Sequence, residues 1–236
     1  MSLFPGTPQR PKEFPGNKGL KIAVEPMKTT ITISRQMGTG GSYIGQIIAT
    51  RLGFKYVDRE VLHLAAEEFG CEDEAVASRA ERVSSFWERI LGGLTFGTPD
   101  RHYNPPPVRT FSDKQLFEKQ TDILRRIASK HNCIVIGWAG VYVLPRHPGM
   151  FNIFCHAPRS FRIKRVLDVY ENSNPETARI LIKESDEMRE RYFAEMTGHE
   201  WTCAHNYHLS IDTSLLPLED IAEMIITIIK GRGLID

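Results

Sequence analysis

The sequence lacks several features that would point to particular classes of protein. None of its 4 cysteines forms a CxxC pair, which argues against a zinc ribbon or a thioredoxin-like site and favours reduced thiols in the cytoplasm. The longest apolar run near the end, IAEMIITIIK, is too short and too interrupted to span a bilayer. The formal net charge is only +1, so no bulk electrostatic field draws the chain to nucleic acid or to a membrane.

The N-terminal stretch MSLFPGTPQRPKEFPGNKG has no apolar core of the signal-peptide type. Its prolines and glycines predict that residues 1–28 form a flexible extension. Residues 29–236 are numerous enough for a single domain with its own core. A composition of 41% hydrophobic and 25% charged residues is typical of a soluble globular protein. We therefore expect one folded domain in a cytoplasmic protein.

Apolar periodicity predicts that β-strands alternate with α-helices after residue 29. The run TITIS is rich in β-branched residues and ends at glycines, as buried strands often do. The expected strands span 30–34, 54–58, 132–137, 150–157 and 208–212, and the expected helices span about 42–52, 59–69, 72–91, 112–130, 158–170, 175–196 and 217–230. This alternation predicts an α/β fold in which helices cover both faces of a parallel sheet.

Turn-forming residues mark the ends of several of these elements. Ser112 is the expected N-cap of its helix, and Asn174 with Pro175 suits the cap and first position of another. Gly231 is expected to stop the last helix. Residues 92–110, by contrast, lose all periodicity and predict a long loop of the functional or disordered kind.

The first strand leads into a glycine cluster, RQMGTGGS, which is followed at once by a helix. The N-terminus of a helix attracts anions, and glycines let the backbone approach them closely. In the Walker pattern GxxxxGK[ST], Arg35 would replace the first glycine and Gly41 the lysine, and Ser42 would supply the hydroxyl that reaches magnesium. The residues predicted to cradle phosphates are Gly38, Thr39, Gly40, Gly41 and Ser42.

Two other interpretations of the glycines remain open from the residues alone. The cluster could form only a tight strand-to-helix turn that binds no ligand. Gly38, Gly40 and Gly45 also give GxGxxxxG, which approaches the dinucleotide fingerprint GxGxxG, and Asp58 ends the second strand where it could hold a ribose. An NAD-dependent oxidoreductase, however, would not account for the arginine-rich helices further along the chain.

Six motifs follow one another along the chain: ISRQMGTGGSYIG, YVDRE, IVIGWAG, HAPRSFRIKRV, KESDEMRERYFAEMTGHEW and NYHLSIDTS. In this order they resemble the cytidylate kinase-like family, a branch of the P-loop nucleoside monophosphate kinases, over roughly residues 30–230. The resemblance implies a five-stranded parallel sheet with a phosphate loop. It also implies an acceptor-binding helical region at 59–131 and a mobile lid at 158–196. Members of this branch commonly have GSGG or GTGG where other cytidylate kinases have the lysine.

The chain departs from the family pattern at the end of one strand. The motif usually reads IxGR, and its arginine would help to hold the acceptor nucleotide, whereas this chain reads IGWAG with Trp138. An aromatic ring can stack on a base, but it cannot make a bidentate pair with phosphate. Asp58 and Arg59 follow the second strand at the ligand-binding edge, and the resemblance places both near the acceptor, although Asp58 also suits a helix cap.

Arginines in the lid region are the candidate catalytic residues, because phosphoryl transfer needs positive charge around the moving group. Three arginines recur at every third position in PRSFRIKRV, so neighbours share a helix face. Arg189 and Arg191 are two apart and should point in different directions, and each could instead pair with a carboxylate such as Asp186. The resemblance assigns Arg162, Arg189 and Arg191 to the lid. Arg35 is the nearest candidate in sequence to replace the missing lysine charge.

These observations lead to a kinase-like protein that uses ATP and Mg²⁺. The leading expectation is transfer of the γ-phosphoryl group of ATP to a nucleoside monophosphate such as CMP, or to a similar acceptor. The alternative is a nucleotide-binding protein with little or no kinase activity, acting as a sensor or partner. The expected ligands are a nucleotide and a small phosphate acceptor, without nucleic acid or membrane, and homo-oligomer formation is left open.

Overall fold

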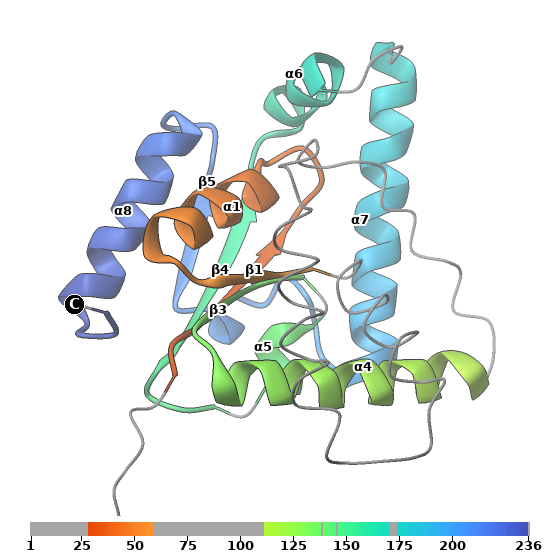
Figure 1. Ribbon diagram of the computed structural model, residues 1–236. Coiled ribbons are helices and arrows are strands. Elements are labelled where there is room, and N and C mark those ends of the chain that lie inside the picture. Colours follow the sequence, from red (N-terminus) through yellow and green to blue (C-terminus); the bar gives the residue numbers. More distant parts are fainter. Residues whose placement is uncertain (1–27, 59–110, 138, 145, 170–173, 236) are drawn as a thin grey trace, which may run out of the picture.

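The centre of the molecule is a parallel sheet of five strands in the order β2-β3-β1-β4-β5 (Figure 1). The computed structural model describes residues 28–58, 111–137, 139–144, 146–169 and 174–235. The strands are β1 (Thr30–Arg35), β2 (Lys55–Val57), β3 (Cys133–Ile136), β4 (Met150–His156) and β5 (Leu209–Asp212). The predicted α/β fold with a five-stranded parallel sheet is therefore confirmed.

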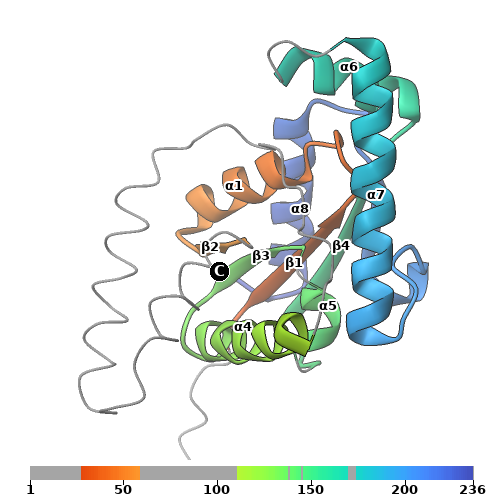
Figure 2. The ribbon, with the colours of Figure 1, turned by 90° about the vertical axis from the view of Figure 1, so that its right-hand side faces the viewer.

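Helices cover both faces of this sheet. On one face lie α1 (Gly41–Leu52) and α8 (Leu218–Gly231), and on the other lie α4 (Phe111–Lys130), α5 (Gly140–Val143) and the lower part of α7 (Pro175–Thr197) (Figures 1 and 2). Helix α6 (Arg159–Val169) packs beside the upper part of α7, beyond the carboxyl end of β1 (Figure 2). A single turn of 3₁₀ helix, η1 (Ala204–Asn206), precedes β5.

Strand β1 shows how the two faces differ. Ile31 and Ile33 are fully buried among the apolar side chains of α1 and α8. Because side chains alternate along a strand, Thr30, Thr32 and Ser34 point to the opposite face. There the Thr32 hydroxyl donates to Oδ1 of Asn152 at 2.8 Å, so this buried polar group is satisfied. By the same alternation Arg35 continues the isoleucine side and reaches the edge of the sheet next to α1.

The ends of the elements agree only partly with the turn signals. Asn174 caps α7 by accepting from the N–H groups of Glu176 and Thr177, with Pro175 first in the helix, as predicted. The prediction for Ser112 as an N-cap was wrong, because Ser112 is the second residue of α4, whereas α8 ends at Gly231, within one residue of its predicted end. The short helix α5 was not predicted, since 4 residues are too few to show a period.

Several expectations fall on residues that the structure does not describe. These are the helices at 59–69 and 72–91, the loop at 92–110 and nearly all of the N-terminal extension. Within the described ranges, no helix combines the length and the apolar character needed to cross a membrane.

Candidate functional site

The glycine loop, residues 36–40, joins the carboxyl end of β1 to the start of α1. Gly38 and Gly40 both have φ of +78°, a left-handed conformation that glycine adopts at little cost. The Thr39 hydroxyl donates to the carbonyl of Gln36 at 2.8 Å and steadies the turn. Gly40 is the N-cap of α1 and offers no side chain to its first turn. The first N–H groups of α1 are therefore available to an anion.

Arg35 lies across the position where a Walker loop carries its lysine. A Cβ atom at position 41 would lie 2.8 Å from Cβ of Arg35, so only glycine fits beneath this side chain. Nε of Arg35 donates to the Ser42 hydroxyl at 3.2 Å. At position 137 a Cβ atom would overlap Nη1 of Arg35. Two glycines thus leave room for the Arg35 side chain beside the N-terminus of α1, Gly41 for its Cβ and Cγ atoms and Gly137 for its guanidinium group.

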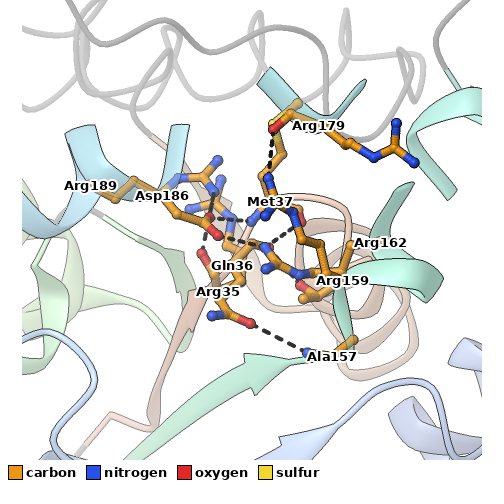
Figure 3. Close-up of polar contacts among 10 residues, drawn as sticks. Arg35, Gln36, Met37, Ala157, Arg159, Arg162, Arg179, Asp186 and Arg189 are labelled. Carbon is orange, nitrogen blue, oxygen red and sulfur yellow. Dashed lines mark hydrogen bonds and ion pairs between the residues drawn. The ribbon is translucent and has the colours of Figure 1, made fainter. Parts of the chain in front are cut away.

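On its other side the loop is tied to α6 and α7 (Figure 3). The N–H of Met37 donates to Oδ1 of Asp186 at 2.8 Å, and the Met37 carbonyl accepts from Nη1 of Arg162 at 3.3 Å. Arg162 Nη1 also donates to Oδ2 of Asp186 at 2.5 Å. Arg189 Nη1 lies 3.7 Å from Oδ1 of Asp186 and donates to the Arg35 carbonyl at 3.4 Å. A charged cluster from two helices therefore holds the loop backbone.

Apolar packing adds to this attachment. The Met37 side chain is buried in a small cluster with Val166 of α6 and with Ala178 and Ile182 of α7. A Cβ atom at Gly38 would lie 2.8 Å from the backbone carbonyl oxygen of Arg162. The start of α6 therefore rests directly on the loop, which is why position 38 needs glycine.

A further cation lies beside the start of α1. Cζ of Arg165 is 6.0 Å from the centroid of the Tyr43 ring, and the Tyr43 hydroxyl donates to Oε1 of Glu219 at 2.9 Å. This hydrogen bond raises the pKa of Tyr43. The pKa of Glu219 is lowered by its own backbone N–H and then by Tyr43. Nε of Arg165 is buried without a hydrogen-bond partner, and it would lie 3.2 Å from a Cβ atom at Gly40. A buried donor left unsatisfied next to the loop suits an anionic ligand.

The structure brings most, but not all, of the predicted site residues together. Arg35, Arg162 and Arg189 meet at the glycine loop, where Arg35 bonds to the Ser42 hydroxyl, Arg162 to the Met37 carbonyl and Arg189 to the Arg35 carbonyl. Arg191 is exposed on α7 and does not share the contacts of Arg189, because positions two apart on a helix diverge. Asp58 is half-buried after β2, two strands from β1 and hence about 10 Å away along the same edge. Arg59 and Trp138 lie outside the described residues.

Three contributors were missed by the sequence reasoning. Met37 and Gly137 lie within the quoted motifs but were given no role there, since their roles depend on contacts with distant segments. Asp186 was considered only as one possible partner of an arginine, whereas it joins two arginines and the loop. Ala139, next to Trp138, has φ of +52°. This left-handed strain in a residue other than glycine marks the turn after β3 as a constrained part of the edge.

Comparison with known proteins decides the family. The model of the cytidylate kinase-like family matches residues 30–215. The chain belongs to the cytidylate kinase-like family. The match includes the glycine loop, Gly137 and the α6–α7 pair, so the contacts of Arg35, Met37, Arg162, Asp186 and Arg189 all lie within the matched range. No curated protein matches the chain.

One solved structure with a TM-score above 0.5 shows the same fold as this cytidylate kinase-like protein. The chain is similar to an uncharacterized protein from Eubacterium ventriosum ATCC 27560, with a TM-score of 0.63 and 20% identity over 86% of this chain and 99% of that one. A gluconokinase from Sinorhizobium meliloti 1021 gives a TM-score of 0.47 and 15% identity, over 86% and 92% of the two chains. A shikimate kinase from Acinetobacter baumannii, in complex with shikimate, gives 0.44 and 14%, over 88% and 96%.

Proposed function

We propose that this cytidylate kinase-like protein binds ATP at the glycine loop and transfers its γ-phosphoryl group to a small phosphate acceptor such as CMP. The observation that carries the proposal is the position of Arg35. Its Cβ and Cγ atoms lie against Gly41 and its Nε donates to the Ser42 hydroxyl, so the loop has a full positive charge beside the place where the Walker lysine is missing. A turn without a ligand would not need a cation beside an uncapped helix N-terminus.

Each group of the site has a role that follows from its position. The backbone N–H groups from Gly38 to Ser42 cradle the phosphate oxygens, and Arg35 supplies charge to the β- and γ-phosphates. Arg162 and Arg189 are held at the other side of the loop, where they can stabilise charge on the transferring group. The unsatisfied Nε atoms of Arg162 and Arg165 provide further donors.

Magnesium fits the site through few protein ligands. Among the described residues, no group of three or more His, Cys, Asp or Glu side chains could hold a metal ion. Ser42 accepts one hydrogen bond from Arg35 and keeps a second lone pair. Mg²⁺ commonly uses one or two protein oxygens together with phosphates and water, so Ser42 would be its ligand on the loop. When bound, the ion would neutralise charge on the phosphate oxygens.

The acceptor is the less defined part of the proposal. Asp58, Arg59 and Trp138 are its proposed contacts, within or next to the region 59–131. Trp138 would stack on a base, and the reduced phosphate contact at this position favours a slow reaction with ordinary monophosphates. A second function, nucleotide binding with little transfer, is favoured by one observation: Asp186 already engages both lid arginines.

A transfer assay separates these two functions. The protein would be incubated with γ-labelled ATP, Mg²⁺ and a panel of acceptors that includes CMP and other nucleoside monophosphates as well as shikimate and gluconate. The proposed kinase transfers label to at least one phosphate acceptor, and transfer to CMP is slow. Arg191→Ala is the matched control for Arg189→Ala, and only the latter should lower turnover. ATP binding without transfer to any acceptor would support the second function, and absence of ATP binding would contradict both.

A further inference from the structure

The backbone N–H, the backbone carbonyl and the side chain of Met37 all contact residues of α6 or α7, the proposed lid. Its N–H and its carbonyl bond to Asp186 and Arg162, and the residue, which is 7% exposed, packs its side chain against α6 and α7. Since Met37 belongs to the glycine loop, these contacts make the loop and the lid one packed unit. Separating them would expose the methionine and leave a backbone donor and a backbone acceptor without partners, which is unfavourable.

Asp186 is the point where these contacts converge. One carboxylate accepts from the Met37 N–H at 2.8 Å and from Arg162 at 2.5 Å, and it lies 3.7 Å from Arg189. Its side chain is 18% exposed and that of Arg162 is 10% exposed, so solvent screens the pair only partly. Two arginines against one aspartate leave a net charge of +1, before the charges of Arg35 and Arg165 are added. The region therefore stays attractive to a polyphosphate.

We propose that Asp186 is a positioning residue that fastens α7 to the Met37 backbone and holds Arg162 and Arg189 at the loop before a nucleotide binds. Arg162 gives only Nη1 to Asp186 and Met37, while its buried Nε lacks a partner, so the guanidinium keeps a donor for phosphate. The Asp186 bond to Met37 uses a backbone amide that faces the lid. The claim that Asp186 holds Arg162 and Arg189 for a nucleotide rests on the proposed function. The claim that it attaches α7 to the Met37 backbone rests on the loop contacts alone.

A competing role for the same carboxylate makes the opposite prediction. If Asp186 only occupied the arginines in place of a phosphate, its removal would free them and ATP would bind more tightly. If Asp186 positions them, its removal leaves Arg162 and Arg189 without orientation and ATP binds more weakly. The sign of the change in affinity therefore distinguishes the two roles.

The experiment compares Asp186→Ala and Asp186→Asn with the unaltered protein, using Glu190→Gln, an exposed acidic residue on the same helix, as the matched control. Hydrogen exchange of the peptide that contains Met37 reports fastening, and calorimetry reports ATP affinity. We expect Asp186→Ala to lose protection at the loop while β3 and β4 stay protected, and to bind ATP about tenfold more weakly, the equivalent of one charged hydrogen bond. Asp186→Asn keeps an acceptor for the Met37 N–H and should retain most of the protection.

Unchanged exchange at the loop in Asp186→Ala would overturn the inference, and so would equal or tighter ATP binding by that variant. A general loss of protection across the sheet would show that alanine unfolds the protein, and Asp186→Asn would then decide by the sign of its change in ATP affinity. If the unaltered protein binds no ATP, the proposed function fails instead. The exchange measurement would still show whether Asp186 fastens the loop.

Discussion

The two groups of arginines beside the glycine loop differ in what balances their charge. Arg35 bonds to a hydroxyl, and within the described part of the chain it forms no ion pair with a carboxylate. Arg162 and Arg189 instead share Asp186. An uncompensated charge next to helix N–H groups attracts an anion strongly, whereas a compensated charge is held in a fixed place. The comparison separates Arg35, which we propose binds the nucleotide, from Arg162 and Arg189, which Asp186 holds in place.

Arg35 on one side of the loop and Arg162 and Arg189 on the other also differ in what fixes their positions. The position of the Arg35 side chain depends on Gly41 and Gly137, because Cβ atoms at these two positions would displace it. Arg162 and Arg189 depend on packing, because the Met37 side chain packs between α6 and α7. Substitutions should therefore affect the first group mainly through ligand affinity and the second group mainly through stability.

The largest expected effect on stability comes from Arg162→Ala. This variant leaves Asp186 partly buried without its closest ion-pair partner and removes a donor from the Met37 carbonyl. We expect the free energy of unfolding to fall by about 3 kcal/mol, against less than about 0.5 kcal/mol for the exposed Arg191→Ala. Urea denaturation of both variants measures the difference. Equal losses would show that the compensated cluster contributes nothing to stability.

Two glycines with similar backbone conformations test the contact between the glycine loop and α6. Gly38 has φ of +78° and Gly53 has φ of +64°, but only Gly38 lies against another segment, the carbonyl of Arg162. Alanine at either position should cost about 1–2 kcal/mol in backbone strain. Only Gly38→Ala should also weaken ATP binding, by about tenfold or more, because α6 must move off the loop. Thermal denaturation with calorimetric titration checks both, and equal ATP affinity of the two variants would argue against the contact.

The smallest expected effect concerns His208, which directly precedes β5 and makes no contact with the arginines of the glycine loop in the described structure. It gives a reference for the size of the effects above. Burial lowers the pKa of His208, and its Nδ1 accepts from the backbone N–H of Asn152 at 2.8 Å. The unfolded chain therefore binds a proton at a higher pH than the folded protein does. Stability present above the ordinary histidine pKa of about 6.5 should fall as the pH drops below it. Urea denaturation at about pH 7.5 and about pH 5.5 should show that the free energy of unfolding falls modestly at the lower pH. This fall should be smaller in His208→Asn. An equal fall in that variant would exclude His208 as its source.

The fold was predictable because its signals are local. The β-branched run at residues 30–34, the apolar face of α1 and the cap at Asn174 each specify an element within a few residues of sequence. Once strands and helices alternate, a parallel sheet is nearly obligatory. The short elements α5 and η1 were not predicted, because 4 and 3 residues are too few to show a hydrophobic period.

The candidate site was predictable only in part, because its key contacts join distant positions. Arg35 and Ser42 are 7 residues apart and could be related through the loop pattern. Met37 and Asp186 are 149 residues apart, and neither local sequence predicts a contact with the other. The divergence of Arg189 and Arg191 follows from helix geometry, but which of them faces the loop depends on how α7 packs against the sheet and α6. Tertiary packing, therefore, decides the assignments that the pattern left open.

The role of Arg35 is tested most directly by ATP affinities, measured by calorimetry, of Arg35→Ala, Gly41→Lys and the double variant Arg35→Gly with Gly41→Lys. The double variant completes the Walker pattern as GQMGTGKS. We predict that Arg35→Ala binds ATP about tenfold more weakly and that Gly41→Lys alone also loses affinity, because its Cβ would lie 2.8 Å from Cβ of Arg35. The double variant should regain at least the original affinity, since lysine then has both the room and the role. Unaltered ATP affinity in Arg35→Ala would contradict the account and leave the loop without its cation.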